Sequence, residues 1–207
     1  MNLPNKLTAS RFALTVLFLW AMFSRAQFHD TLALFLFCAA GGTDYLDGQL
    51  ARRRNLITSF GVLMDPLADK ILICSAFIAL VERHALTPPM PFCLGPLPVY
   101  PKVEAWMVVL IVARELAITG LRLLAASKSV VLAAEGYGKH KTISQIIAII
   151  ALLVMEACLE WPPGLQHALD WWVPVFAQFA LWVTVTLTAT SGALYLWRNR
   201  ALYLSEV

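Results

Sequence analysis

Six apolar runs alternate with short polar or proline-rich segments along the 207-residue chain, covering residues 12–23, 32–51, 62–81, 103–126, 143–159 and 171–197. A bilayer core about 30 Å thick requires roughly 20 mostly apolar residues for each helical crossing. Runs of this length and character predict helices rather than strands. We therefore expect an all-α, polytopic membrane protein with six transmembrane helices in one bundle, built as a single domain over residues 1–207.

Two proline-rich segments interrupt the pattern. Residues 87–101 contain six of the eleven prolines and are expected to form a loop, because proline lacks the backbone N–H that helices and sheets use. Residues 161–164 separate the fifth and sixth runs. A cleaved signal peptide is an alternative for the first run, because Lys6 and Arg11 precede it and the sequence before Ala26 resembles a cleavage site. A retained first helix gives six crossings, which return both termini to one side of the membrane.

The composition excludes an ordinary soluble domain. Hydrophobic residues make up 59% of the chain and charged residues 14%, whereas soluble domains carry about 25% charged residues. The net charge of +3 is small, and no nucleic-acid partner is expected. The four cysteines are widely separated, which argues against a zinc site or a disulfide framework. Membrane lipids are therefore the expected surroundings.

The basic residues indicate an orientation, because cytoplasmic loops of membrane proteins are enriched in lysine and arginine. If both termini are cytoplasmic, Arg25, Arg83 and Lys102 lie outside. The inside then carries Lys6, Arg11, Arg52, Arg53, Arg54, Arg122, Lys128, Lys139, Lys141, Arg198 and Arg200. We expect cytoplasmic N- and C-termini in the inner (cytoplasmic) membrane of the cell, with an active site that faces the cytoplasm. The histidines are expected in loops, as bystanders: His29, His84, His140 and His167.

Four aspartates lie within or against the second and third apolar runs, where an ionised carboxylate costs roughly 2.5 to 3.5 kcal/mol. Asp44 and Asp47 are spaced i, i+3 and Asp65 and Asp69 are spaced i, i+4, so each pair occupies one face of its helix. Antiparallel packing of the two helices would bring both pairs together at the cytoplasmic boundary. Four negative charges there repel one another unless cations bind. The hard divalent cations Mg²⁺ and Mn²⁺ suit such oxygen ligands.

Small residues surround these aspartates. Gly48, Ala51 and Gly61 leave room for a nucleotide diphosphate close to the backbone, and Arg52 can donate two hydrogen bonds to a phosphate. Small residues also let membrane helices approach closely, which is their commoner use in bilayers. Arg52 and the two arginines that follow it can equally anchor the cytoplasmic side. The fixed spacing of Arg52 to the aspartates favours a role in binding.

The combined pattern Asp44-x2-Asp47-Gly48-x2-Ala51-Arg52-x8-Gly61-x3-Asp65-x3-Asp69 resembles the full signature of the CDP-alcohol phosphatidyltransferase family. The resemblance implies a homodimer of six-helix subunits, with two divalent metal ions between the four aspartates and the diphosphate of CDP-diacylglycerol. It implies that all four aspartates are metal ligands and that Asp69 is also the general base. It further implies contacts to CDP-diacylglycerol from Gly48, Ala51, Arg52 and Gly61.

Other segments resemble the members of this family whose acceptor is glycerol 3-phosphate. The opening segment, with Asn5 and Thr8, resembles their N-terminus and is expected to contact CDP-diacylglycerol. Two further segments resemble the acceptor region of these members: Ala113-Arg114-Glu115-Leu116-x2-Thr119-Gly120-Leu121-Arg122 and Gly138-Lys139-His140-Lys141-Thr142-x2-Gln145.

The basic residues of these two segments have an independent physical meaning. Arg122, Lys139 and Lys141 lie at cytoplasmic helix ends and could together bind a phosphate dianion. The two lysines could instead meet anionic lipid headgroups. Arg114 lies deeper, where it could contact the acceptor or, with Glu115, simply neutralise charges inside the bundle.

The expected reaction is an attack by the primary hydroxyl of glycerol 3-phosphate on the β-phosphorus of CDP-diacylglycerol, with loss of CMP. Positioning and charge neutralisation would dominate the catalysis. Three alternatives remain: the same chemistry with an inositol phosphate or serine as acceptor, a membrane prenyltransferase, and a cation transporter with intramembrane carboxylates. A prenyltransferase commonly needs a second aspartate-rich motif, which the last three runs lack. A transporter gives Gly48 and Arg52 no role.

Overall fold

The computed structural model describes residues 3–54, 59–86, 92–94, 97–99, 101–128 and 137–200. Side chains are described for residues 9–43, 67–68, 70–85, 101–128 and 141–200.

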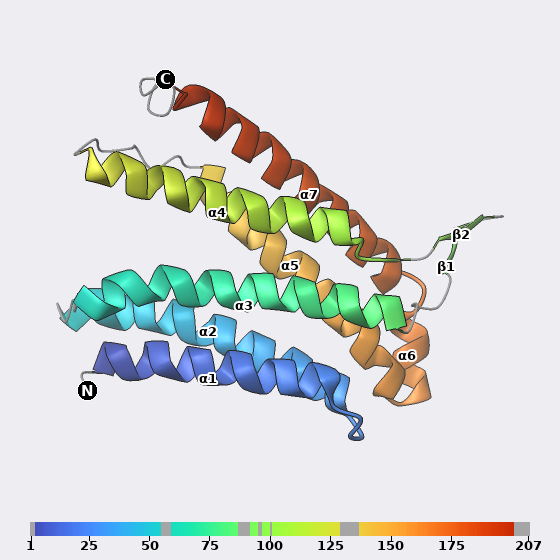
Figure 1. Cartoon of the computed structure of the whole chain (residues 1–207). Coiled ribbons are helices and arrows are strands. Elements are labelled where there is room, and N and C mark those ends of the chain that lie inside the picture. Colours follow the sequence, from blue (N-terminus) through green and yellow to red (C-terminus); the bar gives the residue numbers. More distant parts are fainter. Residues whose placement is uncertain are drawn as a thin grey trace.

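Six long helices form the bundle, and each overlaps one of the apolar runs. They are α1 (Leu3–Phe23), α2 (His29–Arg54), α3 (Ser59–Leu86), α4 (Ala105–Ser127), α5 (Tyr137–Ala157) and α7 (Val173–Arg198). The predicted all-helical bundle is thus confirmed in its architecture. One end of the bundle holds the starts of α1, α3 and α5 and the ends of α2, α4 and α7 (Figure 1).

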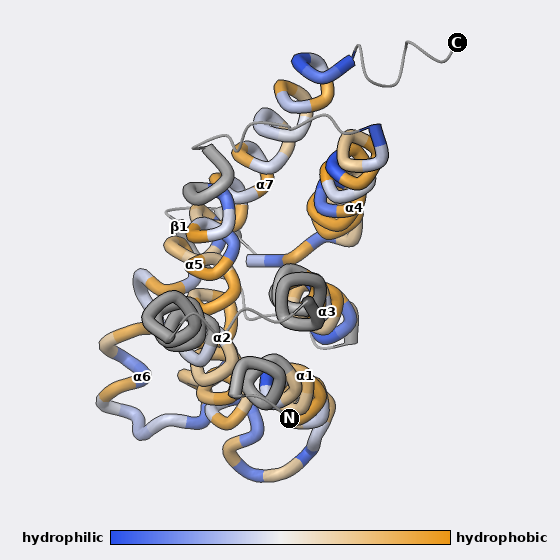
Figure 2. Tube along the Cα trace, turned by 90° about the vertical axis from the view of Figure 1, so that its left-hand side faces the viewer, coloured by the Kyte–Doolittle hydropathy of each residue, from blue (hydrophilic) through white to orange (hydrophobic). Residues whose placement is uncertain are grey.

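The long helices stand in two layers of three. Helices α2, α5 and α7 form one layer, in which α5 contacts both neighbours, and α1, α3 and α4 form the other, in which α3 contacts both neighbours. Pairs α1–α2, α3–α5 and α4–α7 join the layers. Figure 2, which looks along the helices from the left of Figure 1, shows both layers and the central position of α3 and α5. Helices α3 and α5 therefore each contact helices of both layers.

The proline-rich segment contains more than a loop. Two short strands, β1 (Phe92–Leu94) and β2 (Leu97–Val99), pair antiparallel, with Cys93 opposite Pro98. A proline fits here because a two-stranded ribbon consists only of edges, so its missing N–H need not belong to the ladder. At the same end of the molecule, the break between α5 and α7 holds a 3₁₀ turn, η1 (Cys158–Glu160), and a short helix, α6 (Pro163–Leu169).

The core is apolar and continuous, with Phe18, Phe37, Phe77, Ile111 and Leu152 fully buried. Large apolar side chains also cover the outside of the bundle. On α4, Val109, Leu116 and Leu123 are each about two-thirds exposed and repeat every seven residues along one face. Soluble monomers rarely expose apolar surface on this scale. The outer surface therefore suits a lipid environment.

Two of the described helical segments are long and apolar enough to cross a membrane, Lys141–Glu160 and Val173–Arg198, and Ala9–Phe23 is a shorter apolar helix. Helix α4 is equally long but carries Arg114, Glu115 and Arg122 within it. These apolar helices, with the exposed apolar side chains on the outside of the bundle, suit a membrane-associated protein.

Candidate functional site

The aspartate pairs lie on continuous helices. Helix α2 runs unbroken through Asp44 and Asp47, and α3 runs unbroken through Asp65 and Asp69, so the i, i+3 and i, i+4 spacings place each pair on one face of its helix. Helices α2 and α3 contact each other. Carboxylate oxygens from two adjoining helices are a donor set that fits divalent cations. The residues therefore fit the metal ions that the family resemblance implies.

Several predicted site residues fall outside the described side chains. Their helices nevertheless assign them to one end of the bundle, where α1, α3 and α5 begin and α2 ends (Figure 1). They are Asn5 and Thr8 in α1, Asp44, Asp47, Gly48, Ala51 and Arg52 in α2, Gly61, Asp65 and Asp69 in α3, and Lys139 in α5.

A polar cavity of about 340 Å³ lies between α3, α4 and α5. Three of the predicted acceptor residues, Arg114, Arg122 and Lys141, line this cavity although they come from two helices. Lys70, the residue after Asp69, lines it from α3. Its size suits a small-molecule ligand.

Positive charge dominates the cavity. Among the residues whose side chains are described, its lining contains four cationic side chains, Lys70, Arg114, Arg122 and Lys141, and one carboxylate, Glu115. Glu115 pairs with Lys141 and lies 3.3 Å from the Arg114 guanidinium. The Glu115 carboxylate therefore neutralises part of this positive charge, which is the role that the sequence suggested as an alternative to acceptor binding. A lining with this positive charge suits an anion with two negative charges, such as a phosphate monoester.

Each cation is oriented by a neighbour. Lys70 donates a hydrogen bond to the Thr119 hydroxyl, and the Arg122 guanidinium lies 5.9 Å from the centre of the Tyr195 ring, within cation–π range. Arg114 donates a 3.4 Å hydrogen bond to Ser191 of α7. A side chain held in this way loses less conformational entropy when a ligand arrives.

The stem of Arg114 crosses α7 at Gly192. A Cβ atom added at Gly192 would lie 2.8 Å from Cγ of Arg114, closer than such atoms approach in proteins. The absence of a side chain at Gly192 therefore allows Arg114 to reach the cavity. No sequence pattern marks Gly192, because its partner Arg114 is on a different helix.

A second cavity, of about 250 Å³, adjoins the first on the other side of the central helices. It lies between α2, α3 and α5 and is mostly apolar, with Phe37, Leu72, Ile146 and Ile150 in its lining. Ile73 and Thr142 line both cavities. A polar and an apolar compartment thus meet beside the central α3–α5 pair, an arrangement that suits an amphiphilic ligand.

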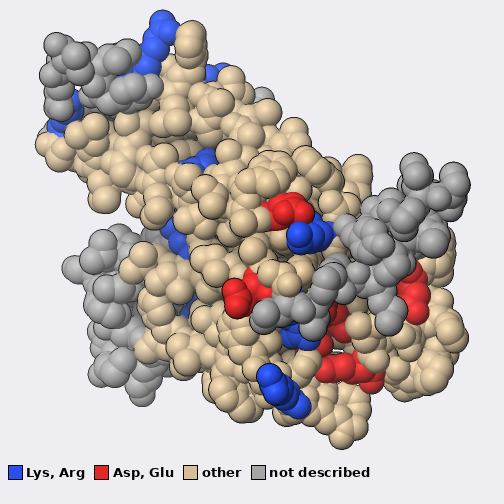
Figure 3. Space-filling model, turned by 45° about the vertical axis from the view of Figure 1, so that its right-hand side comes forward, with Lys and Arg blue, Asp and Glu red and all other residues tan. Residues whose placement is uncertain are grey.

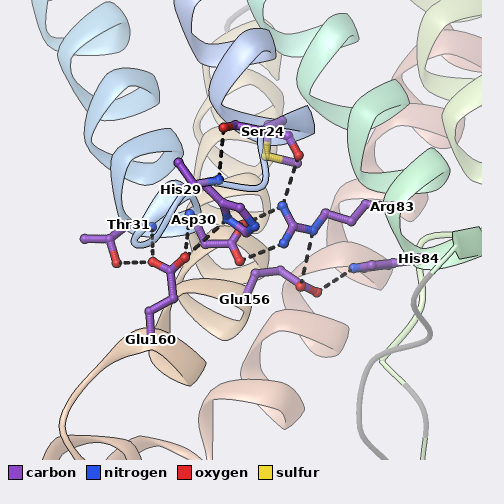
Figure 4. Close-up of polar contacts among 10 residues, drawn as sticks. Ser24, His29, Asp30, Thr31, Arg83, His84, Glu156 and Glu160 are labelled. Carbon is purple, nitrogen blue, oxygen red and sulfur yellow. Dashed lines mark hydrogen bonds and ion pairs between the residues drawn. The ribbon is translucent and has the colours of Figure 1, made fainter.

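The opposite end of the bundle holds a second set of charged residues, shown in Figure 4. Arg83 of α3 makes two contacts with the Asp30 carboxylate of α2, at 2.5 and 2.7 Å, and its Nε lies 3.7 Å from Glu156 of α5. His84 accepts a 3.1 Å hydrogen bond from the backbone N–H of Val103 through Nδ1. Its Nε2 therefore carries the proton that is donated to Glu156, 3.1 Å away.

Glu160 completes this group, which we call the end network (His29, Asp30, Thr31, Arg83, His84, Glu156 and Glu160). Its carboxylate accepts hydrogen bonds of 2.9 Å from the backbone N–H groups of Asp30 and Thr31, in the first turn of α2. Those N–H groups have no partner within the helix, so Glu160 caps α2 from a distant part of the chain. The network ties α2, α3, α5 and η1 together.

The prediction that the histidines lie in loops was wrong. His84 and His140 lie inside α3 and α5, His29 is the first residue of α2, and His167 lies in α6. Buried partners explain the difference for His84, which is 1% exposed and held by Val103 and Glu156. One feature of the sequence could have indicated the end network: residues of opposite charge lie at the edges of several apolar runs.

Basic and acidic side chains are also separated on the surface of the molecule. Basic side chains are visible in the recess at the left of Figure 3, and acidic side chains gather on the right-hand part of that face.

Comparison with known proteins identifies the family. The CDP-alcohol phosphatidyltransferase family profile matches residues 1–197. The chain is 39% identical over 213 residues to a Bacillus subtilis (strain 168) protein named CDP-diacylglycerol--glycerol-3-phosphate 3-phosphatidyltransferase, covering 96% of this chain and 95% of the relative. Proteins of the same name from Shigella flexneri serotype 5b and Rickettsia bellii are 30% and 29% identical, over 99% and 94% of this chain and 98% and 93% of theirs. The chain therefore belongs to the CDP-alcohol phosphatidyltransferase family.

Proposed function

We propose that this chain transfers the phosphatidyl group of CDP-diacylglycerol to glycerol 3-phosphate, forming phosphatidylglycerophosphate and CMP, a step in the biosynthesis of anionic phospholipids. The names of the three relatives support this reaction. The structural observation that carries the choice of acceptor is the cationic cavity between α3, α4 and α5. An acceptor that already bears a phosphate needs such a pocket, whereas serine does not.

The acceptor phosphate would bind to Lys141 and Arg122, with Arg114 and Lys139 contributing further positive charge. Lys141 is 4% exposed, so its attraction for a phosphate is screened less than that of a surface lysine. Glu115 would hold Lys141 and Arg114 in place for the acceptor. These side chains would orient the free hydroxyl of glycerol 3-phosphate for attack, which is a contribution of position and entropy.

Asp69 would accept the proton of the attacking hydroxyl. Position 69 immediately precedes Lys70, which lines the acceptor cavity, and lies one helical turn before Ile73, which lines both cavities. The new bond joins the hydroxyl oxygen to the β-phosphorus, and the bond from that phosphorus to the oxygen of CMP breaks. Asn5, Thr8, Gly48, Ala51, Arg52 and Gly61 would hold CDP-diacylglycerol at the same end of the bundle.

Divalent cations fit the four aspartates, and this family uses divalent metals. We assign two ions, Mg²⁺ or Mn²⁺, to Asp44, Asp47, Asp65 and Asp69. When bound, they would neutralise the charge of the diphosphate and of the departing CMP. Excess EDTA is expected to stop turnover, and added Mg²⁺ or Mn²⁺ to restore it. Turnover that persists in excess EDTA would remove the metal assignment.

The arrangement of the chain in the membrane is proposed from its apolar helices and interfacial tryptophans. We propose six crossings by α1, α2, α3, α4, α5 and α7 in a single domain over residues 1–207, with both termini and the active site on the cytoplasmic side of the inner membrane, and a homodimer as the assembled form. The exposed apolar faces of the helices support the crossings. Trp106 and Trp197 are exposed near opposite helix ends, where aromatic residues meet the membrane interface.

The test is an acceptor panel on the purified full-length protein. CDP-diacylglycerol and Mg²⁺ are incubated with glycerol 3-phosphate, an inositol phosphate or serine, and release of CMP and the lipid product are measured. Efficient turnover with glycerol 3-phosphate alone is expected. Preference for either other acceptor would replace the proposed acceptor while keeping the chemistry. Metal uptake into proteoliposomes without lipid turnover would replace the enzyme by a transporter.

A further inference from the structure

Gln145 is the one described glutamine in the cationic cavity. Its side chain is 1% exposed, and its Nε2 atom has no hydrogen-bond partner among the described residues. A buried amide nitrogen without a partner costs free energy, because it gave up its hydrogen bonds to water. A bound ligand that supplies an oxygen atom would remove this cost.

The position of Gln145 separates it from the cations that would hold a phosphate. It follows Lys141 by four residues on α5, so both share one helix face and their backbones lie about 6 Å apart along the axis. Lys141 lies near the start of α5, at the end of the bundle where the aspartates lie, so Gln145 is one turn deeper. A ligand whose phosphate meets Lys141 can place its carbon body beside Gln145.

The chemistry of an amide also differs from that of the cations. A carboxamide offers both a donor and an acceptor, whereas Lys and Arg only donate. A phosphate monoester only accepts and is already provided with four cations in the cavity lining. A hydroxyl group both donates and accepts, so it can pair with either end of the amide.

Resting on the proposed function, we propose that Gln145 is a specificity-determining residue whose side-chain amide hydrogen-bonds the secondary hydroxyl of the glycerol 3-phosphate acceptor. The primary hydroxyl is then left free for the reaction at the β-phosphorus. A site that is built to bond a substrate hydroxyl rejects an analogue lacking it, because the buried polar group then stays unpaired. The residue therefore distinguishes glycerol 3-phosphate from a phosphorylated alcohol that lacks this hydroxyl.

The experiment compares two acceptors on the full-length protein in lipid vesicles with CDP-diacylglycerol and Mg²⁺. One is glycerol 3-phosphate, and the other is 3-hydroxypropyl phosphate, which lacks only the secondary hydroxyl. The unmodified protein should show a kcat/KM about ten- to a hundredfold higher with glycerol 3-phosphate. In Gln145→Met, which has a similar size and no hydrogen-bonding group, this ratio should fall to within about threefold of unity.

Two further variants distinguish a hydrogen bond to the hydroxyl from a general effect of the substitution. Gln145→Glu places an oxygen where Nε2 stood, so the hydroxyl can donate to residue 145 instead of accepting from it, but the added charge repels the phosphate. The KM of both acceptors should therefore rise while the ratio between them persists. Gln178→Met is the matched control, because the Gln178 Oε1 atom is also buried without a partner among the described residues and lies outside the cavity lining. It should leave both kcat/KM values unchanged.

Three results would overturn the assignment. The first is an unmodified protein that uses both acceptors equally well, which needs no variant. The second is an equal loss for both acceptors in Gln145→Met, which would assign the amide to the phosphate or to packing. The third is loss of the ratio in the Gln178→Met control. Failure of the proposed function looks different, since the unmodified protein would then turn over neither of these acceptors and prefer one from another class.

Discussion

The two charged regions of this bundle are built from similar residues and differ in how those residues are paired. In the end network, each carboxylate has a donor: Arg83 contacts both Asp30 and Glu156, and Glu156 also accepts a hydrogen bond from Nε2 of His84. In the cavity, the described lining has four cations and one carboxylate, and the amide nitrogen of Gln145 has no described partner. The described lining of the cavity therefore carries a net positive charge, whereas the end network does not.

The end network also contains a cluster of side chains that resembles a metal site by distance alone. His29, Asp30 and Glu160 offer ligand atoms within 4.8 Å of one another, as a metal site does. Asp30, however, is bound by the Arg83 guanidinium, and Glu160 accepts two backbone N–H groups and the Thr31 hydroxyl. A cation there would have to displace those donors and face a fixed positive charge. The closeness of these ligand atoms is therefore explained by hydrogen bonds and ion pairs within the protein and does not by itself indicate a metal site.

The largest expected effect separates chemistry from folding. Asp69→Asn removes the proposed proton acceptor, so kcat should fall by about 10² to 10⁴ while CDP-diacylglycerol still binds in the presence of Mg²⁺. Steady-state kinetics and donor binding measure both quantities. The same substitution in the end network, Asp30→Asn, should lower stability and leave the kcat of the folded protein unchanged. A kcat of Asp69→Asn within tenfold of the parent would exclude Asp69 as the base.

The next effect is on stability. Arg83→Met leaves two largely buried carboxylates without their cation, which should cost about 3 to 5 kcal/mol of unfolding free energy. Thermal or denaturant unfolding in detergent measures this loss, and kcat/KM per folded molecule should change by less than about threefold. Arg25→Met, at an exposed position, is the control and should cost less than about 0.5 kcal/mol. An equally small loss in Arg83→Met would show that the end network is not structural.

A smaller effect is expected in the cavity. Lys141→Gln removes a charged hydrogen bond to the acceptor phosphate, worth about 1.5 to 3 kcal/mol, so the KM for glycerol 3-phosphate should rise roughly ten- to a hundredfold. The KM for CDP-diacylglycerol should hardly change, and Arg122→Gln should act in the same direction. Lys102→Gln, an exposed lysine paired with Glu104 at the other end, is the control. A normal acceptor KM in Lys141→Gln and Arg122→Gln would place the phosphate elsewhere.

The smallest effect tests how Arg114 is positioned. Gly192→Ala places a methyl group against the Arg114 stem and should displace the guanidinium from Ser191, raising the acceptor KM about three- to tenfold. Gly120→Ala is the matched control, because a Cβ atom there meets nothing within 4 Å. If both alanine variants have the same acceptor KM, Arg114 does not depend on the space at Gly192.

Hydrophobic patterning predicted all six long helices but not where each begins and ends. The first run starts at residue 12, whereas α1 starts at Leu3, because polar residues can extend a helix without extending its apolar run. The third run ends at residue 81, whereas α3 continues to Leu86. In that extension Arg83 and His84 have partners on α2 and α5, which supply the stability that hydropathy does not record.

The residues of the candidate site could be predicted from the sequence where they belong to a recognisable motif. The two acceptor segments named Arg114, Arg122 and Lys141, and the structure brings these three residues to one cavity. Lys70 was missed because it lies beside the aspartates rather than in a basic segment. The end network was missed because its contacts join residues that are 53 to 130 positions apart. No local pattern in the sequence contains such a contact, and only the packing of helices creates it.

The cap that Glu160 places on α2 sets an order of events during synthesis. The carboxylate lies 130 residues after the N–H of Asp30 that it binds. At about 5 to 20 residues per second, the ribosome delivers it roughly 6 to 26 s after the first turn of α2. During that interval water or lipid headgroups must satisfy the open N–H groups. The amino-terminal helices can enter the membrane early, but this end of the bundle closes only once α5 has been made.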